Sequence, residues 1–151
     1  MIGDSITKPM EILLVEDGLT DARITILALR RSQVHHRLTL VRTVKEAIQF
    51  YRREGIFARA PKPDLMMLDM MLPDGSGIDI LEALGDIQTD DFRTTTVVLT
   101  ASADDSLKQR CAELNVHDYI SKPVQESEFM RVVRDHKKLM IHSTPLLSES
   151  P

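Results

Sequence analysis

Five short apolar runs alternate along the chain with segments whose apolar residues recur at helical spacing. The runs cover residues 12–15, 38–41, 65–68, 97–99 and 119–120. Most of them contain no polar alternation, which is typical of strands buried on both faces of a parallel sheet. Parallel neighbours need crossover connections, and the helical segments supply them. The sequence therefore predicts an α/β fold in which helices cover both faces of a doubly wound, five-stranded parallel sheet.

The segments between and after the runs predict five helices. In the first, Thr20 would be the N-cap, and three apolar residues would share the buried face: Ile24, Leu27 and Ala28. The second begins with Thr43 and Glu46, the spacing of a capping box. The third ends at Gly85, a residue type that suits the left-handed position after a helix. The last two carry apolar stripes at Leu107, Cys111 and Leu114, and at Phe129, Val132 and Val133.

Length, charge and cysteine content exclude several classes of protein. A chain of 151 residues fits one domain. We expect an N-terminal extension over 1–9, the domain over 10–138, and a tail over 139–151 that is too short for an output domain. The net charge of −4 gives no general attraction to nucleic acid or to membranes, and no apolar run could span a bilayer. Cys111 is the single cysteine, so we expect a reducing, cytoplasmic location.

Residues that could form one chemical site follow four of the five apolar runs. Glu16 and Asp17 follow the first run, Asp69 the third and Thr100 the fourth, and Lys122 lies two residues after the fifth. In a doubly wound sheet, ligands bind beyond the carboxyl ends of the strands. Each residue alone would most often be a turn former or a helix cap. Together they predict a site that combines three carboxylates, a hydroxyl and an ammonium group.

Carboxylates gathered in this way repel one another, and their pKa values rise unless a cation lies among them. Mg²⁺ is the best candidate, because it prefers hard oxygen ligands, keeps several waters and pairs with phosphate. Mn²⁺ could substitute for it. Zn²⁺ is disfavoured because no histidine or cysteine belongs to the cluster. The sequence thus predicts a magnesium site at this edge of the sheet.

Four motifs around these residues resemble the receiver domains of two-component response regulators. They are the acidic-pair strand LLVED at 13–17, the acceptor strand and loop DLMMLDMMLPDG at 64–75, the switch strand VLTA at 98–101 and the lysine strand YISKP at 119–123. The motifs follow one another in the order found in the family, and the resemblance covers residues 10–138. It implies a flavodoxin-like (βα)5 fold with strand order 2-1-3-4-5.

The resemblance implies a role for each residue of the acidic cluster. Asp69 would be the phosphoacceptor. Mg²⁺ would be bound by Asp17, Asp69 and the backbone carbonyl of Met71, while Glu16 would act through a water molecule. In the family, the positions of Met71 and Ser102 influence hydrolysis, and neither side chain readily orients an attacking water. We therefore expect the phosphate to be lost slowly, with no other catalytic activity.

The resemblance also implies a conformational switch. Lys122 would pair with the phosphoryl group as a point charge. Thr100 would donate its hydroxyl to a phosphoryl oxygen, and Tyr119 would swing into the space that Thr100 leaves. A cis peptide bond before Pro123 would aim Lys122 into the site.

The partners implied by the resemblance are proteins. A sensor histidine kinase would donate the phosphoryl group, and the VED motif with Asp21 four residues later is most similar to small regulators paired with phytochrome-type kinases. Onward transfer to a histidine phosphotransferase stays open, and no nucleic acid is expected. A homodimer would form through the fourth helix, the fifth strand and the fifth helix, on a face that includes Leu107, Val116, Phe129 and Val132.

Two other functions remain as alternatives. A Mg²⁺-dependent phosphatase of the haloacid-dehalogenase type also uses a strand-end aspartate and a distant lysine. It needs a second aspartate two residues after the nucleophile, where this chain has Met71. A receiver-shaped scaffold that is never phosphorylated would not need Asp69, Thr100 and Lys122 together. Phosphate release from small phosphoesters would favour the first alternative, and indifference to a phosphate mimic would favour the second.

Overall fold

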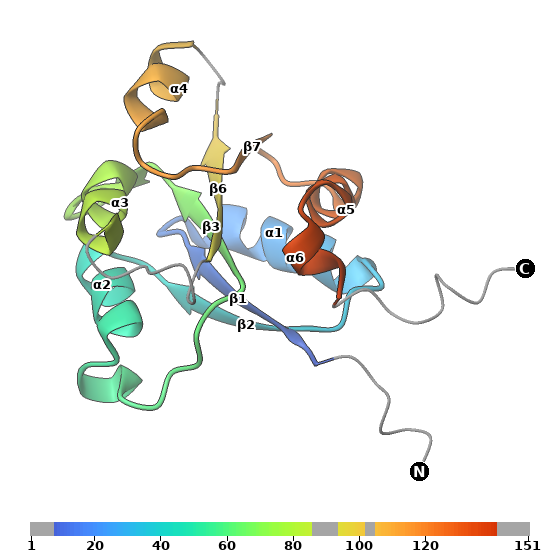
Figure 1. Cartoon of the computed structure of the whole chain (residues 1–151), viewed down its shortest axis with the longest axis horizontal. Coiled ribbons are helices and arrows are strands. Elements are labelled where there is room, and N and C mark those ends of the chain that lie inside the picture. The colour runs from blue at the N-terminus through green and yellow to red at the C-terminus, as the bar shows by residue number, and fades with distance from the viewer. Residues whose placement is uncertain (1–7, 86–93, 102–104, 142–151) are drawn as a thin grey trace, which may run out of the picture.

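The computed structural model describes residues 8–85, 94–101 and 105–141, and within them five parallel strands form one sheet (Figure 1). The strand order is β2-β1-β3-β6-β7. Counted over these five strands, the order is 2-1-3-4-5, so the predicted flavodoxin-like α/β fold is confirmed. The strands are β1 (Met10–Val15), β2 (His36–Val41), β3 (Leu65–Asp69), β6 (Thr95–Thr100) and β7 (Asp118–Ser121).

Helices cover both faces of the sheet, with α1 and α5 on one face and α2 and α3 on the other (Figure 1). A short antiparallel hairpin follows β3 and consists of β4 (Met71–Leu72) and β5 (Gly75–Ser76). A 3₁₀ helix spans Gly55–Phe57. The helices are α1 (Leu19–Arg31), α2 (Val44–Arg52), α3 (Gly77–Gly85), α4 (Asp105–Cys111), α5 (Glu126–Asp135) and α6 (Lys137–Met140).

Alternate residues of β1 pack in two different apolar cores. Ile12 and Leu14 pack in the core under α1 and α5, whereas Leu13 and Val15 pack in the core under α2 and α3. All five residues of β3 are buried. Because both faces of these strands are covered, their sequences lack polar alternation, and polar groups are confined to the strand ends.

The first helix differs from its sequence-based prediction. It begins at Leu19 with Gly18 as the N-cap, so Thr20 is not the cap. Ala28 is buried as predicted, but Ile24 and Leu27 are 38% and 41% exposed, and the other buried residues are Ala22, Thr25 and Leu29. Leu29 is as hydrophobic as Leu27, so the buried face of α1 is rotated from the predicted one rather than less apolar. By contrast, Thr43 caps α2 as predicted, accepting a hydrogen bond of 3.0 Å from the Glu46 amide.

The prediction that Phe129 and Val132 of α5 lie on a dimer face is wrong. Phe129 and Val132 are 0% and 1% exposed, and both belong to the core under α1 and α5. They point toward the sheet because the apolar stripe of an amphipathic helix packs against the core, so they cannot also form a surface for a second copy. Leu107 and Val116 are half-buried.

A short sixth helix that the sequence did not predict follows α5. Its Leu139, assigned above to the tail, is fully buried in the core under α1 and α5. Across the described ranges, no helix combines the length and apolar character needed to cross a bilayer.

Candidate functional site

The strand ends that the sequence singled out meet in one pocket of about 520 Å³ at the carboxyl edge of the sheet. Glu16 and Asp17 follow β1, Asp69 is the last residue of β3, Thr100 is the last of β6, and Lys122 follows β7. The parallel register of β1, β3, β6 and β7 brings these ends together. The predicted residues that line the pocket are Glu16, Asp17, Asp69, Met71, Thr100 and Lys122.

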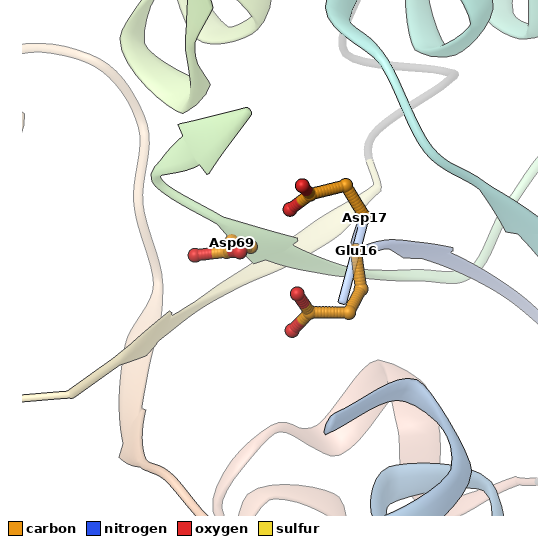
Figure 2. Close-up of side chains that lie close together, drawn as sticks. All are labelled: Glu16, Asp17 and Asp69. Atoms are coloured by element: carbon orange, nitrogen blue, oxygen red, sulfur yellow. The ribbon is translucent and has the colours of Figure 1, made fainter. Parts of the chain in front are cut away.

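The acidic cluster is compact. Figure 2 shows Glu16, Asp17 and Asp69 on the adjacent ends of β1 and β3, and one carboxylate oxygen from each lies within 4.8 Å of the other two. Glu16 is 1% exposed and Asp69 8%. Burial raises the pKa of Glu16 above its usual range; Lys122 opposes this rise and Asp69 adds to it.

The ammonium group of Lys122 is shared among the acids of the pocket. Its Nζ lies 2.8 Å from Oε1 of Glu16 and 3.3 Å from Oδ2 of Asp69. Burial alone would lower the pKa of Lys122, but the two carboxylates outweigh it and raise that pKa. Lys122 is therefore held charged beside the carboxylate predicted to be modified.

These residues fit a divalent cation. The cluster holds three carboxylates, and the ammonium group of Lys122 pairs with those of Glu16 and Asp69, so negative charge remains in excess. All three donors are oxygens, which suits Mg²⁺ or Mn²⁺. A cation bound beside Glu16, Asp17 and Asp69 would offset the repulsion among these carboxylates, which Lys122 relieves only in part.

The loop after β3 turns sharply around the Asp69 carboxylate. The Met71 amide donates a 3.2 Å hydrogen bond to Oδ1 of Asp69, and the Gly77 amide donates to the Met70 carbonyl at 3.0 Å. A Cβ at Gly77 would lie 2.8 Å from Cε of Met70 and 3.0 Å from the Asp69 carbonyl, so glycine allows the close return of the chain. Met71 is 81% exposed, whereas Asp69 is buried at the wall of the pocket.

Further residues border the site, and only some were visible in the sequence. Asp21, in the first turn of α1, reaches Lys122 with Oδ2 3.5 Å from Nζ. Arg42 donates from Nη2 to the backbone carbonyl of Asp17 at 2.8 Å. Asp74 accepts hydrogen bonds from the first amides of α2. Asp74 belongs to the loop motif at 64–75, and Arg42 directly follows the second apolar run. The partner of each is a backbone group, so the sequence did not reveal what either residue contacts.

The predicted switch residues lie on the edge of the site. Thr100 is 7% exposed and lines the pocket, whereas Tyr119 does not line it. Nζ of Lys108 lies 5.5 Å from the centroid of the Tyr119 ring, and burial together with Cys111 raises the pKa of Tyr119. The Lys122–Pro123 peptide bond is cis, as predicted. Ser102 lies outside the described residues.

Comparison with known proteins agrees with this geometry. The family described as response regulator receiver domain matches residues 12–134. Response regulator Rcp1 from Synechocystis sp. (strain ATCC 27184 / PCC 6803 / Kazusa) is 29% identical over 96% of this chain and 98% of its own length.

Two solved structures are also similar. The phosphorylated cyanobacterial phytochrome response regulator RcpA is 32% identical over 85% of this chain and 91% of its own, with a TM-score of 0.71. The Mn²⁺-bound form of Rcp1 is 30% identical over 90% of this chain and 97% of its own, with a TM-score of 0.67.

Proposed function

The chain belongs to the response regulator receiver domain family of two-component signalling, and on this premise we propose that Asp69 accepts a phosphoryl group from a sensor histidine kinase. The observation that carries the proposal is the position of Asp69. Its carboxylate ends β3, lines the pocket, belongs to the acidic cluster and lies beside a charged lysine. Few other functions need all three features together.

The chemistry follows from the charges around Asp69. Transfer breaks the N–P bond of a phosphohistidine and forms an O–P bond to one Asp69 oxygen, and the donor imidazole takes up a proton. Lys122, already 3.3 Å from Oδ2 of Asp69, would pair with the added phosphoryl oxygens. Asp17, Asp69 and the Met71 carbonyl would hold Mg²⁺, with Glu16 reaching it through water. When bound, Mg²⁺ supplies positive charge that reduces repulsion between the phosphoryl group and the carboxylates.

A phosphotransfer assay tests this function. We expect an autophosphorylated histidine kinase to transfer ³²P to the chain in the presence of Mg²⁺ and not after chelation by EDTA. The similarity to RcpA, described as a phytochrome response regulator, supports a phytochrome-type kinase, which should transfer faster than an unrelated kinase. The label should then persist for minutes or longer, because Met71 orients no water. Rapid release of phosphate from small phosphoesters would instead indicate the phosphatase.

We propose that the kinase docks on the surface around Ile24 and Leu27. These exposed side chains line a second pocket with Pro123 and Val124, just after Lys122 in the chain. We expect Leu27→Asp to slow transfer from the kinase while leaving the response to beryllofluoride unchanged. Ile56→Asp is the matched control, since Ile56 is 89% exposed and lies outside both pockets.

We further propose that Thr100 and Tyr119 form the output switch. The chain has two tyrosines and no tryptophan, so the Tyr51→Phe variant leaves Tyr119 as its only tyrosine reporter. In that variant, beryllofluoride with Mg²⁺ should change the Tyr119 fluorescence. Adding Thr100→Val, which removes the hydroxyl but keeps the shape, should suppress the change. Fluorine NMR would verify that beryllofluoride still binds, and an unchanged fluorescence response in bound Thr100→Val would contradict the switch.

A homodimer and a histidine phosphotransferase are the remaining proposed partners. Leu107 and Val116 are half-buried, so we still propose them for the dimer face. Phe129 and Val132 are buried in the core and are no longer part of it. The same beryllofluoride-treated samples, examined by light scattering, would reveal a dimer by its doubled mass. The net charge of −4 supports partners other than nucleic acid.

A further inference from the structure

The junction between β2 and α2 touches both loops that would hold the metal. From Arg42, Nη2 donates to the Asp17 carbonyl at 2.8 Å, which fixes the loop after β1. From the start of α2, the Val44 and Lys45 amides donate to Oδ1 and Oδ2 of Asp74 at 2.8 and 3.1 Å. Asp74 belongs to the connection between β4 and β5, beyond Asp69. Four consecutive residues, 42–45, thus connect the two segments that carry the proposed ligands.

The carboxylate of Asp74 satisfies backbone amides at the start of α2. The first amides of a helix lack intrahelical partners, and Thr43 satisfies only the Glu46 amide of α2. Asp74, from a distant segment, takes two of the remaining amides with its two oxygens. The hydrogen bond from Val44 lowers the pKa of Asp74; burial opposes this effect, and the hydrogen bond from Lys45 reinforces it. A charged Asp74 also suits the positive end of the helix dipole.

The β4–β5 hairpin connects Asp74 to Met71, whose carbonyl would bind the metal. Met71 pairs with Ser76 and Leu72 pairs with Gly75, and Asp74 lies within the turn that joins them. A Cβ at Gly75 would lie 3.2 Å from Cγ2 of Val44, so the hairpin packs directly on the first residue of α2. Because the ladder fixes the register of the hairpin, holding Asp74 restricts where the Met71 carbonyl can lie.

We propose that Arg42 and Asp74 are positioning residues that set the separation between the Asp17 loop and the Asp69–Met71 loop, and thereby the affinity of the site for a divalent cation. Neither side chain belongs to the acidic cluster, so each acts through backbone that it holds. The inference rests on the proposed metal site. It adds that the start of α2 is part of the structure that prepares this site.

Titration calorimetry with Mg²⁺ tests the inference. We expect Asp74→Ala to weaken Mg²⁺ binding about tenfold, the scale seen when residues that orient ligands are removed, and Arg42→Ala to weaken it in the same direction. Asp74→Asn should recover part of the affinity, because its amide oxygen can still accept one of the two hydrogen bonds. Mn²⁺ titration followed by electron paramagnetic resonance gives an independent affinity.

Thr43→Ala is the matched control. It removes the side-chain cap of the same helix, which weakens the helix, but it releases neither loop. Thr43→Ala should therefore keep the wild-type Mg²⁺ affinity. Equal losses in Thr43→Ala and Asp74→Ala, or no loss in Asp74→Ala, would overturn the positioning role. If the wild-type chain itself bound no Mg²⁺, the proposed function would fail instead.

Discussion

The Asp69→Asn variant should accept no phosphoryl group from any donor that modifies the wild-type chain. Asparagine has almost the same shape, but its neutral amide lacks the anionic oxygen that attacks phosphorus. The substitution also removes one of the three carboxylates of the cluster, so Mg²⁺ affinity should fall. We therefore expect no ³²P incorporation and no response of Tyr119 to beryllofluoride. A phosphate-affinity gel and the fluorescence assay would measure the two effects.

The stability of Asp69→Asn without Mg²⁺ is a second, independent test of the role of Asp69 in the cluster. Asp69 contributes to the raised pKa of Glu16, so its charge is a source of repulsion in the empty cluster. Lys122 keeps its shorter contact with Glu16, 2.8 Å, when Asp69 is neutralised. We therefore expect Asp69→Asn to melt without Mg²⁺ at a temperature no lower than the wild type. The exposed Asp105→Asn serves as the control and should be phosphorylated normally; persistent labelling of Asp69→Asn would mean that another residue is the acceptor.

The site was predictable from the sequence because the sheet does most of the positioning. Parallel strands of similar length finish at one edge, so the residues after β1, β3, β6 and β7 had to converge. Glu16, Asp69, Thr100 and Lys122 follow from this rule without knowledge of any loop. Their distances do not follow from it, because they depend on how each loop turns.

The second set of contacts could not be predicted for a physical reason. Arg42 binds a backbone carbonyl, and Asp74 binds backbone amides. Backbone groups are present at every residue, so no spacing or residue type in the partner segment announces such a contact. These interactions become visible only when the loops are placed in space.

Helix faces were the weakest part of the sequence-based prediction. In α1, only Ala28 of the predicted face is buried, whereas Ile24 and Leu27 are exposed and Leu29 lies in the core. In α5, Phe129 was given both a place in the apolar stripe and a place on the dimer surface. Periodicity identifies an apolar face but not what covers it, and here the sheet covers Phe129.

Phe129→Ala should therefore destabilise the monomer strongly. Phe129 is fully buried and makes an edge contact with the His36 ring, the centroids being 6.5 Å apart. Truncating a buried phenylalanine costs about 3–5 kcal/mol of unfolding free energy, a large part of the roughly 5–15 kcal/mol of an ordinary domain. Urea denaturation followed by circular dichroism would measure the loss, and the melting temperature should fall by about 10 °C.

The concentration dependence of this effect separates the core from an interface. If Phe129 lies in the core, the loss of stability is the same in dilute and concentrated protein, since no association is involved. If it lay between two copies, the alanine variant would lower the apparent mass in light scattering and leave the dilute monomer as stable as the wild type. Met140→Ala supplies the comparison, because Met140 is 49% exposed and its truncation should change stability by only about 0.5 kcal/mol or less. If Phe129→Ala were as stable as Met140→Ala, Phe129 would not be a core residue, and α5 could again be proposed as part of a dimer interface.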